Sequence, residues 1–117
     1  MKVALSGVLF LFSAIASAQD ASVGKDLFQE CVACHSIKSG ENLVGPSLAG
    51  TYGKKAGAAE GFRYSGPLKK SGLTWDEGAL DAYIANPQAA IPGTRMPYSG
   101  MSSAESRKNL IAYLRTL

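Results

Sequence analysis

Residues 19–117 are predicted to form an all-α domain. Two segments carry the capping-box pattern, in which a serine or threonine is followed three residues later by glutamate: Thr74 to Glu77 and Ser102 to Glu105. Apolar residues recur at helical spacing after each box. No stretch alternates apolar and polar residues convincingly, as a half-buried strand would. A chain of 117 residues suggests one such domain.

Residues 1–18 have the features of a secretory signal peptide. Lys2 supplies a positive charge, residues 3–15 are apolar, and Ala16-Ser17-Ala18 is a cleavage site of the A-x-A form. A retained membrane anchor is the alternative, but the apolar stretch is shorter than the ~20 residues that a spanning helix needs. We therefore expect cleavage after Ala18 and a periplasmic domain of residues 19–117.

The domain is expected to begin with a helix over residues 20–33. Ser22 is its expected N-cap, and Leu27 and Cys31 fall on one face of it. Gly24 inside a helix costs about 1 kcal/mol relative to alanine. A close crossing with another helix would give this glycine a packing role.

A long loop and a short helix are expected next. Residues 36–61 are rich in glycine, include Pro46 and contain few apolar side chains. A long irregular segment in a small domain is usually functional, and enclosing a cofactor is one such function. Residues 65–71 are expected to form a short helix with Ser65 as N-cap and Gly72 just past its end.

Two further helices follow the capping boxes. The first is expected to contain Leu80 and Tyr83 and to end before Pro87. Residues 91–97 contain two prolines and a glycine, which exclude a helix or a central strand. The last helix has an apolar stripe made of Leu110, Ile111, Leu114 and Leu117.

The segment Cys31-Val32-Ala33-Cys34-His35 is the attachment pattern of a c-type haem. Residues three apart lie on one helical face, so each thiol can add to one haem vinyl group. The histidine that follows becomes the proximal iron ligand. A thioredoxin-like disulfide is less consistent, because no βαβ pattern surrounds the motif. Half of a zinc site is also less consistent, because the chain has no second cysteine pair and no second histidine.

Pro46 is the candidate hydrogen-bond partner of His35. A metal-bound histidine normally donates its other ring N–H to a carbonyl or carboxylate oxygen. Pro46 follows His35 by 11 residues within the long loop, and its carbonyl oxygen can serve this purpose. An ordinary turn proline is the alternative interpretation.

Elimination reduces the number of candidates for the distal iron ligand. His35 is the only histidine, so two histidine ligands from one chain are excluded. A methionine, a lysine or an open position remains. Met96 lies in the rigid 91–97 loop and is preferred over Met101, which is expected to pack in the core just before the last helix. A thioether ligand raises the reduction potential and suits electron transfer.

The chain resembles class I cytochromes c of the bacterial cytochrome c2 and mitochondrial cytochrome c type over nearly all of residues 23–117. The resemblance implies crossing N- and C-terminal helices, loops around one covalent haem c, and His35 and Met96 as axial ligands. It rests on these motifs in this order: Gly24–Phe28, Cys31–His35, Val44–Gly50, Gly61–Tyr64, Gly72–Trp75, Tyr83–Pro87, Ile91–Met96 and Leu110–Leu114.

The same resemblance implies roles for residues around the haem. Tyr64 and Trp75 would hydrogen-bond a propionate, and Pro46 would accept from His35. Tyr83 and Thr94 would lie on the distal side, with the Tyr83 hydroxyl near the methionine sulfur.

Three residues depart from the family pattern. Lys54 stands where arginine is common near the propionate, and Leu68 stands where asparagine often belongs to the distal polar network. Tyr98 stands where an aromatic residue, often phenylalanine, covers the exposed haem edge. A hydroxyl group at that position makes the edge more polar.

These features predict a monohaem cytochrome that carries single electrons between periplasmic redox proteins. The partners expected are a bc1-type complex or a periplasmic dehydrogenase, and a terminal oxidase or reductase. No catalytic activity, nucleic acid, small-molecule substrate or membrane span after cleavage is expected. The alternatives are a dedicated haem subunit of a sulfite or alcohol dehydrogenase complex, and a haem sensor with an exchangeable distal ligand.

A basic rim for an acidic partner is a further hypothesis, with a scattered charged surface as its alternative. The candidate residues are Lys38, Lys54, Lys55, Lys69, Lys70 and Arg95.

Overall fold

The computed structural model describes residues 1–11 and 19–117, and its regular elements are all helical. In chain order they are α1 (Ala21–Leu27), η1 (Phe28–Glu30), α2 (Gly66–Lys70), α3 (Glu77–Ala85), α4 (Pro87–Ala90) and α5 (Ala104–Leu114). Within the described ranges the strand-like pairing is one isolated bridge between Lys55 and Thr74. The all-α prediction is confirmed.

Residues 1–11 form no helix or strand, and their side chains are exposed. The predicted cleavage site at Ala16-Ser17-Ala18 lies outside the described residues. None of the helices in the described ranges is both long enough and apolar enough to cross a membrane.

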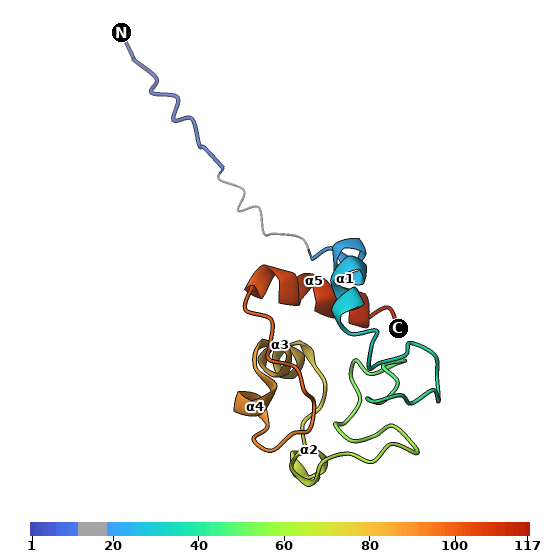
Figure 1. The fold of residues 1–117 in the computed structure, drawn as a ribbon. Helices are drawn as coiled ribbons and strands as arrows, with labels where there is room; N and C mark the ends of the chain where they lie inside the picture. The colour runs from blue at the N-terminus through green and yellow to red at the C-terminus, as the bar shows by residue number, and fades with distance from the viewer. Residues whose placement is uncertain (12–18) are drawn as a thin grey trace.

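Helices α1 and α5 cross at close range, as Figure 1 shows, and this crossing was expected from Gly24. A β-carbon on Gly24 would lie 2.9 Å from the Tyr113 β-carbon. The rings of Phe28 and Tyr113 have centroids 5.3 Å apart, and Leu110 is buried beside them. The glycine therefore permits the contact that joins the two ends of the domain.

The first helix is shorter than predicted and has a different cap. Asp20, rather than Ser22, is the N-cap, because its carboxylate accepts from the backbone N–H groups of Ser22 and Val23. The Ser22 hydroxyl itself donates to this carboxylate. The helix tightens into η1, where the Cys31 N–H bonds to the Phe28 carbonyl at 2.8 Å.

One isolated helical turn follows η1 and keeps the two cysteines at helical spacing. The His35 N–H donates to the Cys31 carbonyl at 3.0 Å, four residues back. The expected relation between Cys31 and Cys34 therefore holds, although the predicted helix over residues 20–33 was wrong at its C-terminal end.

Both capping boxes lie one or two residues before the true helix start. Asp76 caps α3, since Thr74 is held extended in the bridge with Lys55. Ser103 caps α5 through the Ser106 N–H, instead of Ser102. The predicted Ser65 cap of α2 is confirmed.

Helix α4 was not predicted. Helix α3 does end at Ala85, before Pro87, as expected. Asn86 then accepts from the Ala89 N–H at 3.2 Å and caps a new helical turn that begins at Pro87. Asn86 therefore ends α3 and also begins α4.

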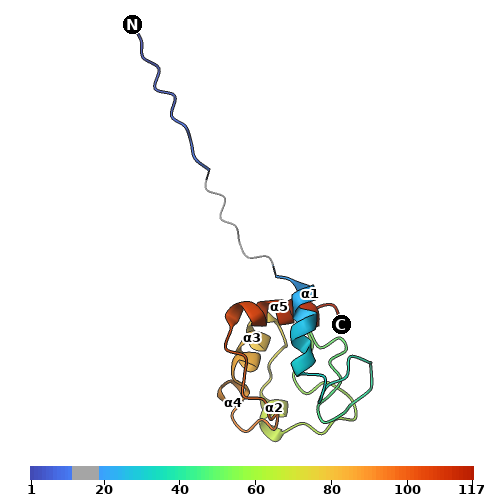
Figure 2. The same ribbon diagram turned by 45° about the horizontal axis from the view of Figure 1, so that its top comes forward.

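The long loop of residues 36–61 lies on the opposite side of the domain from α3 and α4 in both views (Figures 1 and 2). It contains turns and bends but no helix, as predicted. The bridge of Lys55 to Thr74 and the hydrogen bond from the Gly50 N–H to the Leu117 carbonyl at 3.1 Å fasten this loop to the helical part.

Candidate haem-binding site

A cavity of about 310 Å³ opens in the interior of the domain. Its walls come from the long loop, from the helices and from the segment around Met96. All the site residues that the sequence predicted line this one cavity: Cys31, Cys34, His35, Pro46, Tyr64, Trp75, Tyr83, Thr94 and Met96. Residues up to 65 positions apart in the chain are therefore brought together, while their individual roles remain predictions.

Apolar side chains of the helices form much of the remaining wall. Phe28, Leu80 and Ile84 line the cavity from η1 and α3. Leu110 and Leu114 line it from α5, so the apolar stripe of the last helix serves the cavity as well as the core. Such a largely apolar pocket with a few polar groups is the usual form of a cofactor site.

The proximal side is built around His35. Its Nδ1 atom lies 2.7 Å from the Pro46 carbonyl oxygen, so the expected contact is present. An N–H at Nδ1 leaves Nε2 unprotonated and able to bind a metal. The backbone of the long loop is also bonded to the residue before His35, because the Gly45 N–H donates to the Cys34 carbonyl at 2.8 Å.

Gly45 is a site residue that the sequence analysis missed. A β-carbon there would lie 2.4 Å from His35 Cε1 and 2.8 Å from Nδ1, distances too short for any side chain. Only glycine lets the backbone pass this close to the imidazole. Its position immediately before Pro46 was the available signal.

Elsewhere on the cavity wall, Tyr83 and Thr94 share a hydrogen bond of 2.6 Å between their hydroxyl groups. Burial raises the pKa of Tyr83, and the bond to Thr94 partly opposes that shift. The Gln88 side chain donates to the Thr94 carbonyl at 2.6 Å and accepts from the Gly93 N–H at 3.2 Å. Gln88, which was not predicted, therefore fixes the start of the segment that carries Met96.

Tyr64 and Trp75 line the cavity from different segments. The Tyr64 hydroxyl accepts from the Ala59 N–H at 2.9 Å, so its own hydrogen is left to donate elsewhere. Burial raises the pKa of Tyr64, which keeps the hydroxyl protonated. The Trp75 ring packs on Tyr83 with centroids 5.1 Å apart. Both side chains are suited to donate to an acidic group of a bound molecule.

Asn42 joins two parts of the long loop, and the sequence analysis did not identify it. Its side-chain oxygen accepts from the Ser47 N–H at 3.0 Å, and its amide group donates to the Glu60 carbonyl at 2.9 Å. This contact holds the segment after His35 against the segment before Tyr64.

Only part of the proposed basic rim lies at the cavity. Lys54, Lys55 and Arg95 line it, together with Arg63, which was not in the predicted set. Lys38, Lys69 and Lys70 lie elsewhere on the surface.

The two thiols are half-buried at the cavity wall and are not paired in a disulfide. Burial, followed by the charge of Glu30 and by Cys34, raises the pKa of the Cys31 thiol to about 11. In residues 1–11 and 19–117, no group of three or more histidine, cysteine, aspartate or glutamate side chains is placed to hold a metal ion.

The model of the family described as Cytochrome c matches residues 21–117. The chain belongs to the cytochrome c family. The cytochrome is 52% identical to cytochrome c2 iso-2 of Magnetospirillum molischianum, over 77% of this chain and 93% of that protein. It is 45% identical to cytochrome c2 of Blastochloris viridis, over 92% of this chain and 86% of that protein.

A solved structure agrees with the fold as well. Cytochrome cH from Methylobacterium extorquens superposes with a TM-score of 0.81 at 44% identity, over 84% of this chain and 99% of that one. The cytochrome thus has the class I cytochrome c fold.

Haem c is the cofactor of this family, and the cavity fits it. The wall offers two thiols three residues apart, an oriented imidazole, one thioether and otherwise mostly apolar groups. The cytochrome therefore binds one covalently attached haem c and carries single electrons.

Proposed function

We propose that Cys31 and Cys34 form the two thioether links to haem c, and that His35 and Met96 are the axial ligands of its iron. One observation carries the proposal: these four side chains line a single cavity. The contact between His35 Nδ1 and the Pro46 carbonyl supports the use of Nε2 as the ligand atom.

Met101, the competing methionine, is less suited to this role. Its side chain is buried in the hydrophobic core and does not line the cavity. Its N–H is held by the Ile84 carbonyl at 2.9 Å. These contacts support Met96 as the distal ligand.

Other residues on the wall would orient the cofactor. Tyr64 and Trp75 are proposed to donate to a haem propionate. Tyr83 and Thr94 are proposed to form the polar part of the distal side, next to Met96. Lys54 would place a single positive charge near the propionates, without the paired geometry of an arginine.

The proposed physiological role is a diffusible one-electron carrier of the bacterial periplasm. Residues 1–18 would direct export and be removed after Ala18. Haem iron with one imidazole and one thioether ligand cycles between the ferric and ferrous states at a raised potential. Electrons would come from a bc1-type complex or a dehydrogenase and pass to an oxidase or reductase. We assign no catalytic reaction to the chain.

The visible spectrum of the purified protein tests the ligand assignment. We expect a sharp α-band in the reduced form and a weak far-red charge-transfer band in the oxidised form, the signature of low-spin iron with a methionine ligand. The reduced protein is expected not to take up carbon monoxide. Ready carbon monoxide binding would favour a sensor with an exchangeable distal ligand.

Variants identify which methionine is involved. Met96→Ala should abolish the far-red band, lower the reduction potential and admit carbon monoxide, while the haem stays attached. Met101→Leu removes the other thioether but keeps an apolar side chain in the core, and it should retain the band. The reverse result would transfer the ligand role to Met101.

Two measurements test the cellular part of the proposal. The mass of the exported protein should correspond to a chain that starts at Gln19. The cytochrome should elute separately from periplasmic dehydrogenases. Stable co-purification with one of them would favour a dedicated haem subunit.

A further inference from the structure

Tyr98 and Glu30 connect two segments that are 68 residues apart in the sequence. The Tyr98 hydroxyl donates to Glu30 Oε2 at 3.0 Å. Glu30 directly precedes Cys31, and Tyr98 comes two residues after Met96. This hydrogen bond therefore links the haem-attachment segment to the segment that carries the proposed distal ligand.

The Tyr98 hydroxyl is the donor in this bond, because a carboxylate oxygen of Glu30 can only accept. The ring of Tyr98 lines the cavity, whereas Glu30 is exposed.

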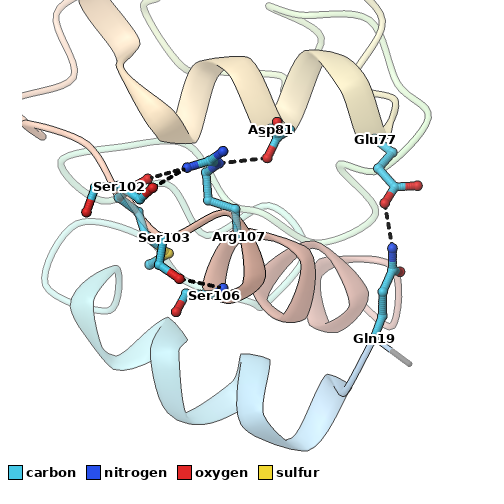
Figure 3. Close-up of polar contacts among 8 residues, drawn as sticks. Gln19, Glu77, Asp81, Ser102, Ser103, Ser106 and Arg107 are labelled. Atoms are coloured by element: carbon cyan, nitrogen blue, oxygen red, sulfur yellow. Dashed lines mark hydrogen bonds and ion pairs between the residues drawn. The ribbon is translucent and has the colours of Figure 1, made fainter. Parts of the chain in front are cut away.

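The segment around Met96 is well anchored at both ends. At its start, Thr94 is held by Tyr83 and Gln88. At its end, Arg107 donates to the carbonyl oxygens of Met101 and Ser102, each at 2.9 Å. Figure 3 shows the Arg107 guanidinium between these backbone groups and Asp81.

Between these anchors, residues 95–100 make few hydrogen bonds to the rest of the chain. In the described part of the chain, residues 95–100 make two hydrogen bonds to other segments. One joins Arg95 to the Arg63 carbonyl at a long 3.4 Å. The other is the shorter bond of Tyr98 to Glu30, on the C-terminal side of Met96.

We propose that the Tyr98–Glu30 hydrogen bond is a latch that holds the Met96 segment closed over the cavity. Tyr98 and Glu30 are then positioning residues for Met96, and the inference rests on the proposed axial role of that methionine. An external ligand can reach the iron only when the segment opens. Loss of a bond made only in the closed form raises the open population and the apparent affinity of that ligand.

Imidazole binding to the oxidised, haem-loaded protein tests the latch. Imidazole is used at a pH where it is uncharged, so that a charge change at Glu30 does not act on it directly. Tyr98→Phe keeps the ring and removes the donor, and should raise the apparent affinity for imidazole about fivefold, the effect of one typical hydrogen bond. Glu30→Ala should have a similar effect.

Tyr52→Phe is the matched control. The Tyr52 hydroxyl accepts from Arg115 at 2.6 Å, and its side chain does not line the cavity. This variant should leave imidazole affinity unchanged, even if the free energy of unfolding falls as it does for Tyr98→Phe. Glu30→Gln retains an oxygen acceptor and should have a smaller effect than Glu30→Ala.

The double variant Tyr98→Phe with Glu30→Ala decides whether the two residues act as one pair. Its imidazole affinity should match that of either single variant, because the same bond is lost. The latch would be overturned if the affinity increase of the double variant equalled the product of the two single increases. It would also be overturned if Tyr98→Phe left the imidazole affinity unchanged. Absence of the far-red methionine band in the unmodified protein would overturn Met96 ligation and the latch together.

Discussion

A β-carbon on Gly24 would lie 1.9 Å from the carbonyl oxygen of Asn109, so the backbones of α1 and α5 touch at this point. The Asn109 side chain also accepts from the Asp20 N–H at 2.9 Å. These contacts fix how the N-terminal helix lies on the C-terminal one. Phe28, directly after α1, and Leu110 in α5 both line the cavity, so the crossing also shapes the haem site.

Gly24→Ala should lower the free energy of unfolding by about 2–3 kcal/mol, because the helices must separate to accept the methyl group. Denaturant unfolding of the haem-loaded protein measures the change. Gly78→Ala is the control, since a β-carbon on Gly78 in α3 would make only an ordinary contact of 3.7 Å with Asp76 Oδ1. That variant should be neutral or slightly more stable. Equal losses in both variants would contradict the role of the crossing.

Gly45→Ala should displace the His35 ring, since no β-carbon fits 2.4 Å from its Cε1 atom. We expect an increased high-spin fraction in the visible spectrum and a loss of stability of about 1–3 kcal/mol. Gly66→Ala is the matched control, because Gly66 also precedes a proline but a β-carbon there would meet no atom within 4 Å. An unperturbed spectrum in Gly45→Ala would show that the ring tolerates the displacement.

Arg107→Lys should destabilise the protein by about 2 kcal/mol, because a single ammonium group cannot reproduce the guanidinium geometry. The Arg107 side chain is 13% exposed and donates to Asp81 at 2.7 Å as well as to two backbone carbonyls. Asp81→Asn retains an oxygen acceptor at a site that is 43% exposed, so it should cost less than about 1 kcal/mol. Thermal unfolding compares the two, and an equal cost would assign the effect to the ion pair alone.

Asp20→Asn should change the pH dependence of stability. The Ser22 hydroxyl, followed by the N–H groups of Val23 and Ser22, lowers the pKa of Asp20 below its ordinary value of 3.8. A lowered folded-state pKa contributes stability that is present above pH 3.8 and is lost as the pH falls through the lowered value. The difference between the two proteins should therefore be constant at neutral pH and shrink in acid. Unfolding curves that stay parallel across this range would contradict the prediction.

The caps show how far local patterns reach. Ser65 was predicted correctly, because its bond to the Leu68 N–H involves only neighbouring residues. Thr74 was not, because its backbone is held extended by Lys55, a residue from another segment. Helix α4 was missed because Asn86 and Pro87 were interpreted only as a stop signal, although the same pair begins a new turn.

The attachment motif, the apolar stripes and the candidate methionine are properties of short stretches, and periodicity, spacing and elimination were enough to identify them. Gly45, Asn42 and the pair of Glu30 with Tyr98 belong to a different class. Each acts on a group that another segment supplies. Chain spacing does not encode such distances, so these contacts emerge only when the loops are folded against the helices and the long-range packing sets which atoms meet.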